Sequence, residues 1–271
     1  MLLSVVITTK NEGDNIENCL GAFSSFREEV ELIVVDNAST DDTKAKAEAF
    51  GAKVLDIGPE RSAQRNLGWR SAISPWVMIL DADMILPRET IEEILGKIRA
   101  LTRDGGDISA FWIPEVRVGN TWRVKARNFE RSFYDGTAID ALRLFRKSVL
   151  EKTGGYDETL IAGAEDWELD IRVLALGVKA EVLRGALLHN ESKLSFARML
   201  EKKAYYSKSM TAYRAKYVAH PNVKKQFSLY YRYLGVFVEN GKWRKIIAHP
   251  ILFAQVMLER IAVGMVYLLN K

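Results

Sequence analysis

The sequence of 271 residues contains one cysteine, Cys19, and only three histidines. A single cysteine excludes an internal disulfide framework and a cluster of thiolate metal ligands, and it favours a reducing compartment. Any metal ion would therefore be held by oxygen atoms or by histidine. Hydrophobic residues make up 48% of the chain, which is ample for a buried core, so a disordered protein is not expected.

The chain also lacks a basic leader, and its first apolar run is too short for a signal segment, so we expect a cytoplasmic protein. A longer apolar segment, Ile246–Leu269, is interrupted by His249, Pro250, Gln255, Glu259 and Arg260. A membrane-spanning helix is therefore not expected there. The segment could form an amphipathic helix at a membrane surface or a helix packed on the body, and periodicity does not separate the two.

Two glycine-rich patterns are missing from the sequence. It has neither the dinucleotide-binding fingerprint nor the phosphate-binding loop that ends in Gly-Lys-Ser/Thr, which disfavours dehydrogenases and P-loop enzymes. The loop from Thr8 to Gly13 has a single glycine. A sugar-1-phosphate nucleotidyltransferase would normally have a glycine-rich, basic loop there, so this alternative is also disfavoured.

Charge is divided unevenly along the chain. Residues 193–271 hold 15 basic and 3 acidic residues, which gives a net charge of +12. Residues 1–192 hold 24 basic and 32 acidic residues, which gives a net charge of −8. This basic region, with its interleaved aromatic residues, suits an anionic membrane surface or a phosphorylated acceptor, although solvated helix faces would give the same pattern. We expect a helical extension over residues 193–271, attached to the inner face of the cell membrane, and no nucleic-acid partner.

The first hundred residues alternate short apolar runs with helical patterns. Strands are predicted at Leu3–Thr9, Leu32–Asp36, Ala52–Ile57 and Trp76–Leu80. Helices are predicted near Asp14–Phe26, Asp41–Phe50, Arg61–Ala72 and Glu89–Leu101. This order predicts an α/β fold with a mainly parallel, Rossmann-like central sheet flanked by helices.

A polar stretch after Leu101 is predicted to divide this domain into residues 1–105 and residues 106–192. The second half shows strand patterns at Ile108–Val118 and Ala138–Phe145. Between them lies an aromatic and basic stretch, Trp122–Tyr134, which we interpret as a mobile loop. Residues Ala164–Leu176 are predicted to form a helix with an acidic first turn, which the helix dipole favours.

Acidic side chains follow two of the predicted strands. Asp81 and Asp83 come directly after the apolar strand that begins at Trp76, at the sheet edge where ligands of open α/β folds bind. If the backbone is extended, both carboxylates point the same way, and together they could hold a hard divalent cation against a diphosphate. Asp36 ends another strand at the same edge and could accept hydrogen bonds from a base or a ribose, and Glu12 could bind ribose.

Five sequence blocks occur in order within residues 2–190. They are Val-Val-Ile-Thr-Thr-Lys-Asn-Glu, Val-Val-Asp-Asn-Ala-Ser-Thr-Asp-Asp-Thr, Arg-Ser-Ala-Gln-Arg-Asn-Leu-Gly, Leu-Asp-Ala-Asp and Gly-Ala-Glu-Asp-Trp-Glu-Leu. The series resembles the family 2 glycosyltransferases with the GT-A fold. That family usually has Asp-Asp where this chain has Asp36-Asn37, which keeps the first position and could alter base selectivity.

The resemblance implies a nucleotide-sugar site made from the first three blocks and the Asp-x-Asp pair. Residues 1–105 would bind the donor, and the residues that contact it would be Thr8, Glu12, Asp36, Arg65, Asp81 and Asp83. Arg65 would lie near the base or the diphosphate. A Mn²⁺ or Mg²⁺ ion would be held at Asp83, and His189 resembles a histidine that closes the metal site in some GT-A enzymes.

The same resemblance implies an acceptor site in residues 106–192. Asp166 would deprotonate the acceptor, which gives inversion at the anomeric carbon. Beside it, Glu165 is expected to contact the acceptor, and Trp167 could stack on the acceptor sugar or occupy a core position. The function expected is an inverting hexosyltransferase that uses a UDP- or GDP-sugar and a glycan or lipid-linked acceptor. The alternatives are a non-catalytic protein that binds nucleotide sugar or membrane and, less favoured, the nucleotidyltransferase.

Overall fold

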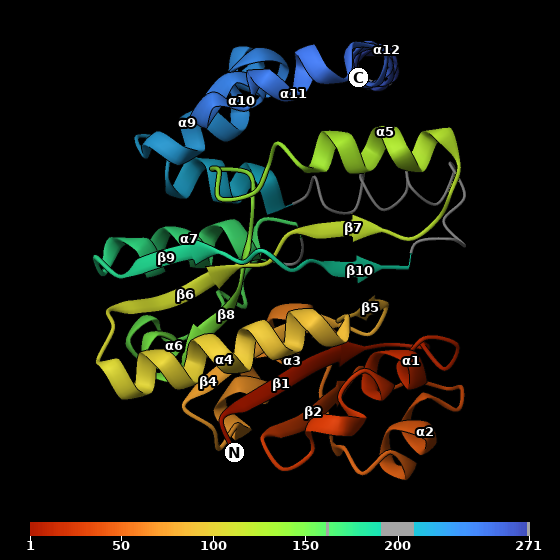
Figure 1. The fold of residues 1–271 in the computed structure, drawn as a ribbon, viewed down its shortest axis with the longest axis vertical. Coiled ribbons are helices and arrows are strands. Elements are labelled where there is room, and N and C mark those ends of the chain that lie inside the picture. Colours follow the sequence, from red (N-terminus) through yellow and green to blue (C-terminus); the bar gives the residue numbers. More distant parts are fainter. Residues whose placement is uncertain (161–162, 191–208, 270–271) are drawn as a thin grey trace.

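The computed structural model describes residues 1–160, 163–190 and 209–269 (Figure 1). Within these residues the chain forms a seven-stranded sheet in the order β3-β2-β1-β4-β8-β6-β9 and a three-stranded sheet in the order β5-β10-β7. The strands of the larger sheet are β1 (Leu3–Thr9), β2 (Val30–Asp36), β3 (Lys53–Asp56), β4 (Trp76–Asp81), β6 (Ile108–Trp112), β8 (Leu142–Arg146) and β9 (Lys179–Val182). Those of the smaller sheet are β5 (Met84–Ile85), β7 (Glu115–Arg117) and β10 (Leu187–His189).

The larger sheet is mainly parallel. Strands β1 to β4 run parallel, with β1 between β2 and β4. Only β8 runs against its neighbours β4 and β6 in the described part of the sheet, and β9 is again parallel to β6. The predicted α/β fold is therefore confirmed, and each of the first four predicted strands agrees with an observed one to within two residues at either end.

Helices cover both faces of the larger sheet. One face packs against α1 (Ile16–Gly21), α2 (Thr43–Ala49) and α4 (Arg88–Asp104), and the other against α3 (Arg61–Ser71), α6 (Lys147–Thr153) and α7 (Glu165–Ala175). A short 3₁₀ turn, Ser24–Phe26, follows α1. Strand β1 shows why both faces are covered: Val5 and Ile7 join one core and Val6 the other, because successive side chains point to opposite faces.

One predicted strand, Ile108–Val118, is two strands in the structure. Strand β6 ends at Trp112 in the larger sheet, and β7 begins at Glu115 in the smaller one. Pro114 lies between them and has no amide hydrogen to donate to a ladder, although its carbonyl accepts a hydrogen bond from the Leu187 amide at 2.8 Å. The proline therefore marks the point where the chain passes from one sheet to the other.

The prediction of a mobile loop at Trp122–Tyr134 was wrong. Most of this stretch is a helix, α5 (Trp122–Arg131), whose first turn is capped by the Thr121 side chain. Ala126, Phe129 and Phe133 are buried and recur at helical spacing, so they form one apolar face. The basic residues between them hide this face in the sequence, because they make the whole stretch look polar.

The described part of the C-terminal extension is helical, as expected. It comprises residues 209–216, α9 (Pro221–Phe227), the π-helical Tyr231–Gly235, α10 (Val236–Val238), the 3₁₀ turn Glu239–Gly241, α11 (Trp243–Ala248) and α12 (Pro250–Leu269). Figure 1 shows α9 to α12 gathered beyond α5, away from β1 and β2. The predicted boundary at residue 192 and the first part of the extension, residues 193–208, lie outside the described residues.

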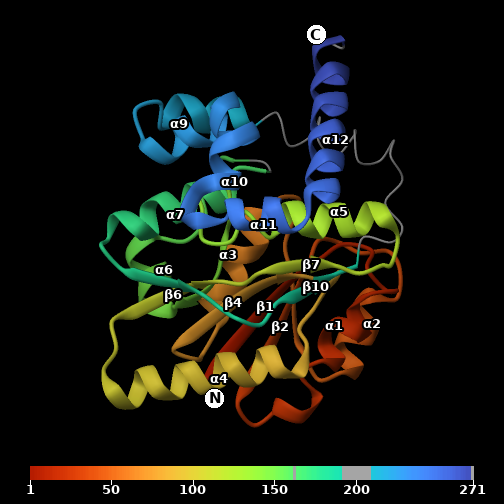
Figure 2. The ribbon, with the colours of Figure 1, turned by 45° about the horizontal axis from the view of Figure 1, so that its top comes forward.

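Helix α12 packs on the body through one face and exposes apolar side chains on another. Its Val256 is buried in a cluster with Phe129 and Phe133, and α12 rises from α5 with its far end pointing away from the sheets (Figure 2). A helix break at His249–Pro250 interrupts the apolar segment predicted at Ile246–Leu269. Among the described residues, no helix combines the length and the apolar character needed to cross a membrane.

Candidate active site

The carboxyl ends of β1, β2 and β4 bring three of the predicted residues to one edge of the sheet. Thr8 on β1 is aligned with Asp81 on β4, and Thr9 is aligned with Asp36 on β2. The Thr8 hydroxyl donates a hydrogen bond to Asp81 Oδ1 at 2.9 Å. Ligands of open α/β sheets bind at this edge, so these side chains lie where the fold can hold one.

The loops after β1 and β2 are tied to each other. The Asn11 amide donates to Ser39 Oγ at 2.8 Å, and Ser39 in turn donates its amide and hydroxyl to the buried Asp36 carboxylate at 2.7 and 2.5 Å. Glu12 accepts a hydrogen bond from the Asn15 side chain at 2.7 Å, where α1 begins. Asp36 therefore stabilises its own loop, and Glu12 belongs to the neighbouring loop at the same edge.

Arg65 on α3 joins the two halves of the site. Its side chain is 1% exposed, with Nη1 at 2.6 Å from Asp166 Oδ1 and Nη2 at 3.5 Å from Asp81 Oδ1. The Nη1 atom also lies 3.5 Å from Glu165 Oε1, and the guanidinium stacks over the Tyr156 ring at 5.1 Å. A buried guanidinium needs such partners, because an uncompensated buried charge is strongly destabilising.

The carboxylates around Arg65 differ in their tendency to ionise. Burial raises the pKa of Asp81, but the charges of Arg61 and Arg65 outweigh it and hold this pKa well below its usual range. The pKa of Glu165 is raised, because this side chain is buried and lies beside Asp166. The Arg65 guanidinium therefore lies between Asp81, which ionises readily, and Glu165, which is harder to ionise.

Asp83 lies in a turn after β4, so the prediction that Asp81 and Asp83 alternate along an extended backbone was wrong. Asp83 Oδ2 is 3.1 Å from His189 Nε2. Asp83 Oδ1 is buried and has no hydrogen-bond partner among the residues that the structure describes. Within the same residues, no three His, Cys, Asp or Glu side chains form a metal cluster by themselves, so a cation held here would also need ligands from elsewhere.

His189 lies at the end of β10 and is held on both sides. Its Nδ1 is 2.6 Å from Glu115 Oε1, and Glu115 Oε2 accepts a hydrogen bond from Arg131 at 2.9 Å and lies 3.6 Å from Arg143. Burial lowers the pKa of His189, but the hydrogen bonds with Asp83 and Glu115 outweigh it and raise this pKa to about 9. Glu115 therefore fixes the orientation of the imidazole ring that faces Asp83.

The three residues predicted to act on the acceptor, Glu165, Asp166 and Trp167, follow one another in the first turn of α7. Gly163 has a φ of 86°, a left-handed conformation that suits glycine, just before the helix begins. Asp166 is 26% exposed, whereas Glu165 is 2% exposed. Trp167 packs toward the extension, with its ring centroid 6.4 Å from that of Tyr213. Of the three side chains, Asp166 is the one that combines a contact to Arg65 with access to solvent.

The sequence profile of glycosyl transferase family 2 matches residues 4–154, which is more than half of the chain. The chain belongs to this family. Membership of this family decides against the nucleotidyltransferase alternative. The profile ends before α7, so it does not include the Glu165-Asp166 pair.

Two curated proteins that are similar to this chain are named glycosyltransferases. A protein of Rickettsia conorii described as an uncharacterized glycosyltransferase is 38% identical over 94 residues, which is 34% of this chain and 32% of that protein. Glycosyltransferase AglE of Haloferax volcanii is 29% identical over 181 residues, which is 60% of this chain and 58% of that protein. The chain thus spans about a third of the first relative and somewhat more than half of the second.

Solved structures of GT-A glycosyltransferases share the fold of this chain. A mannosyltransferase from Pyrobaculum calidifontis, in complex with GDP-Man and Mn²⁺, matches with a TM-score of 0.59 and 18% identity, over 98% of this chain and 80% of that one. Glucosyl-3-phosphoglycerate synthase from Mycobacterium tuberculosis matches with a TM-score of 0.58 and 19% identity, over 79% of each chain. At this level of identity, the similarity establishes the fold.

The candidate site also contains residues that the sequence did not indicate. Glu115, Arg131 and Arg143 form the ion-pair network that holds His189. Glu115 follows Pro114 inside a predicted strand and belongs to no recognisable motif. The one available signal was an acidic side chain in an otherwise apolar strand, which becomes informative only when β7 is placed beside β10.

Proposed function

We propose that this glycosyltransferase is an inverting hexosyltransferase that uses a UDP- or GDP-sugar, with Asp166 as the general base. The observation that carries the proposal is the position of Arg65, whose two terminal nitrogens reach Asp81 at the sheet edge and Asp166 on α7. A nucleotide donor at the edge and an acceptor near α7 would then meet beside one guanidinium. Residues 1–105 would bind the donor and residues 106–192 the acceptor.

The donor would bind over the ends of β1, β2 and β4. Asp36 and Glu12 are assigned to the nucleoside, with Thr8 beside them, and Asp81 to the ribose and diphosphate. Solved structures with the same fold are described in complex with GDP-Man, UDP and UDP-GlcNAc, so both bases are considered. Arg65 and Arg61 lie on the same side of Asp81 and would offset the charge of the diphosphate.

A divalent cation, Mn²⁺ or Mg²⁺, would be held by Asp83 and His189. The fit rests on Asp83 Oδ1, a buried oxygen without a hydrogen-bond partner among the described residues, and on the neighbouring His189 Nε2, which would release its proton when the ion binds. The donor diphosphate would complete the ligand set, as is usual for these ions. When bound, the ion neutralises charge that develops on the leaving diphosphate.

Asp166 would take the proton from the acceptor hydroxyl as that oxygen attacks the anomeric carbon of the sugar. The bond between this carbon and the diphosphate breaks as the new glycosidic bond forms on the opposite face, which inverts the configuration. The Asp166 carboxylate gains the proton, and the nucleoside diphosphate leaves with the electron pair. Glu165 and Trp167 are assigned to the acceptor because they flank this carboxylate in the first turn of α7.

The test begins with a thermal-shift screen of UDP- and GDP-sugars with and without Mn²⁺, because a bound ligand stabilises the folded state. Activity is then measured as release of nucleoside diphosphate from the best donor. Asp166→Asn should lower this activity by about a thousandfold or more and leave donor binding intact. Undiminished activity in Asp166→Asn would overturn the base assignment. Absence of donor-dependent release by the native chain would favour the non-catalytic alternative.

We further propose that the C-terminal extension binds an anionic membrane near a lipid-linked or phosphorylated acceptor. On α12 an exposed apolar stripe recurs at helical spacing and comprises Ile251, Ala254, Leu258 and Ile261. Ile247 on α11 and Trp243 at its start are also exposed. Apolar side chains on a basic extension are the combination that an anionic bilayer surface attracts.

Sedimentation with vesicles tests the membrane proposal with a matched pair of variants. Ile251 is 71% exposed on α12, and Ile73 is 72% exposed in the loop before β4. Ile251→Asp should lower binding to phosphatidylglycerol vesicles by about tenfold, whereas Ile73→Asp should not change it. Equal binding by the two variants, or equal binding to neutral phosphatidylcholine vesicles, would contradict the proposal.

A further inference from the structure

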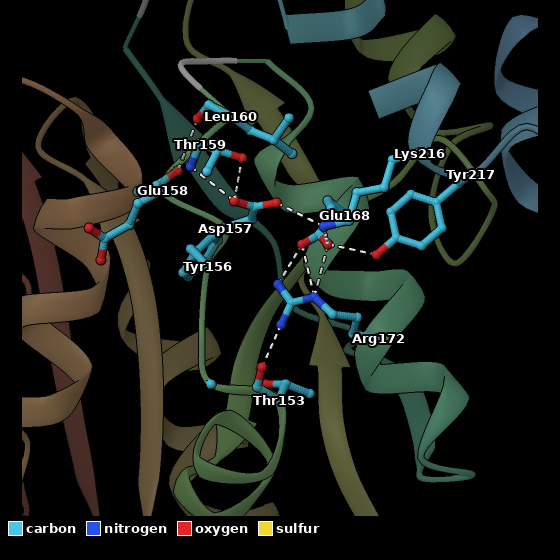
Figure 3. Close-up of polar contacts among 12 residues, drawn as sticks. Thr153, Tyr156, Asp157, Glu158, Thr159, Leu160, Glu168, Arg172, Lys216 and Tyr217 are labelled. Carbon is cyan, nitrogen blue, oxygen red and sulfur yellow. Dashed lines mark hydrogen bonds and ion pairs between the residues drawn. The ribbon is translucent and has the colours of Figure 1, made fainter. Parts of the chain in front are cut away.

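A buried carboxylate joins α7 to the C-terminal extension (Figure 3). Glu168 lies two residues after Asp166, and its side chain is fully buried. It accepts hydrogen bonds from Arg172 on the same helix at 3.0 Å, from Lys216 Nζ at 2.8 Å and from Tyr217 Oη at 2.7 Å. The last two donors belong to the extension, so the first turn of α7 is bound directly to it.

Lys216 also binds Asp157, which lies in the loop that precedes α7. Its Nζ lies 2.8 Å from Asp157 Oδ2, while the Asp157 carboxylate accepts hydrogen bonds from the Thr159 amide at 2.9 Å and hydroxyl at 2.7 Å. Figure 3 shows Lys216 between Asp157 and Glu168. One ammonium group therefore bridges the loop at Asp157 and the first turn of α7, which bears the proposed base.

The loop at Asp157 is anchored on its other side by α3. The Asn66 side chain donates to the Tyr156 carbonyl at 2.9 Å and to Glu158 Oε1 at 2.7 Å. The neighbouring Arg65 stacks on the Tyr156 ring and binds Asp166. Residues 156–158 are therefore bound to α3 on one side and to the extension on the other. Helix α3 also contacts Asp81 in the proposed donor site.

Apolar contacts and charged hydrogen bonds both hold the extension against α7. Tyr213 is fully buried in a cluster with Leu160, Ala164, Ile171 and Val223. Burial raises the pKa of Glu168, but the hydrogen bonds of Arg172, Lys216 and Tyr217 outweigh it and lower this pKa. Glu168 is thus held as a charged acceptor, which a buried carboxylate without these donors would not be.

We propose that Lys216 is a positioning residue for the transfer reaction. It binds both Asp157 and Glu168, and through Glu168 it fixes the first turn of α7 and so the orientation of Asp166. The inference rests on the proposed role of Asp166 as the base. Tyr217 assists by its hydrogen bond to Glu168. Thr8, Asp36 and Asp81, which are assigned to the donor, lie on β1, β2 and β4 of the central sheet, so we expect the Lys216 contact to affect turnover more than donor binding.

The experiment compares Lys216→Met with Lys224→Met, which removes the same charge from an exposed position on α9. Hydrogen exchange is followed in residues 157–160 and 163–168 and, as an internal reference, in β1. Nucleoside diphosphate binding is measured by calorimetry, and turnover is measured as hydrolysis of the best UDP- or GDP-sugar with water as acceptor. Lys216→Arg tests rescue by a side chain that can also bridge two carboxylates.

In Lys216→Met we expect exchange in residues 157–160 and 163–168 to accelerate about tenfold and turnover to fall about tenfold, with diphosphate affinity and exchange in β1 unchanged. Lys216→Arg should recover most of the loss, and Lys224→Met should behave as the native chain. Equal exchange and turnover in the two methionine variants would overturn the inference. Faster exchange throughout β1 would also overturn it, because Lys216 would then support the whole fold.

The same measurements separate this inference from the proposed function. If Asp166→Asn turns over normally, the base assignment fails, whatever Lys216→Met does. If Asp166→Asn is inactive and Lys216→Met turns over as Lys224→Met does, the base assignment stands and the positioning role fails.

Discussion

Arg65 and Asp166 are 101 positions apart in the sequence and are joined by a hydrogen bond of 2.6 Å between Nη1 and Oδ1. Arg65 is also the residue that reaches Asp81 at the end of β4. A change at Asp81, which is assigned to the proposed donor site, can therefore alter the position of Asp166 on α7 through one side chain. A substitution at Arg65 therefore tests the contacts of the proposed donor half and the proposed acceptor half together.

We expect Arg65→Lys to lower donor-dependent diphosphate release by about 10- to 100-fold. A lysine ammonium cannot reproduce the fork by which the guanidinium reaches two carboxylates, and a hydrogen bond to a charged group is worth about 1.5 to 3 kcal/mol. Arg70→Lys is the matched control, because Arg70 is on the same helix with its side chain 53% exposed. Equal rates in the two variants, measured with the donor chosen by thermal shift, would contradict the prediction.

Glu115→Gln should weaken Mn²⁺ binding by about 10- to 100-fold, as is typical when the carboxylate that orients a metal-binding histidine is neutralised. Calorimetric titration with Mn²⁺ in the presence of the nucleoside diphosphate measures this without any turnover. Glu92→Gln serves as the control, because Glu92 is 51% exposed on α4 and pairs with Arg88. An unchanged Mn²⁺ affinity in Glu115→Gln would show that His189 does not need this partner.

The sequence was most informative where chemistry and local structure coincide. Thr8 and Asp81 lie at the ends of apolar strands, and the β-branched residues of these strands allow the strands to be predicted. Parallel pairing of β1 with β4 then brings the two strand ends together. Asp83 was harder to place, because a turn of two residues cannot be distinguished from continued strand by composition alone. Glu115 could not be recognised, because its partner His189 is 74 positions away and the two meet only through the pairing of β7 with β10.

The helix at Trp122–Arg131 was missed for a related reason. Its buried face is short and lies among arginine and lysine residues, and its packing partner, α12, is more than a hundred residues further along the chain. Short amphipathic helices gain most of their stability from such tertiary contacts rather than from intrinsic helix propensity. Local sequence therefore could not distinguish a loop from a helix there.

Phe133→Ala should destabilise the protein by about 3 to 5 kcal/mol, the usual range for removing a buried phenylalanine. The Phe133 ring is fully buried and lies edge-on to Phe129 at 5.0 Å and to Phe237 at 4.9 Å. Leu234→Ala is the control, because Leu234 is 54% exposed and its loss should change stability by less than about 0.5 kcal/mol. Urea unfolding followed by circular dichroism measures both, and similar midpoints would contradict the packing described here.

The contact between Asp157 and Lys216 should make part of the stability depend on pH. Burial raises the pKa of Asp157, but the hydrogen bonds of Lys216 and Thr159 outweigh it and lower this pKa from 3.8 to about 2. The folded state therefore binds this proton less readily than the unfolded state, so the stabilisation is complete above about pH 5 and is lost as the pH falls from 4 toward 2. Its size is at most about 2 kcal/mol.

We expect the native chain to be more stable than Asp157→Asn at pH 6, and about half of the pH-dependent difference should be lost by pH 3. Urea unfolding at pH 6, 4 and 3 gives the two free energies of unfolding. Asp56→Asn is the control, because Asp56 is 58% exposed in its pair with Lys44, and exposed pairs contribute little. A difference between the native chain and Asp157→Asn that stays constant from pH 6 to pH 3 would show that the Asp157 carboxylate is not stabilised by Lys216 in the folded protein.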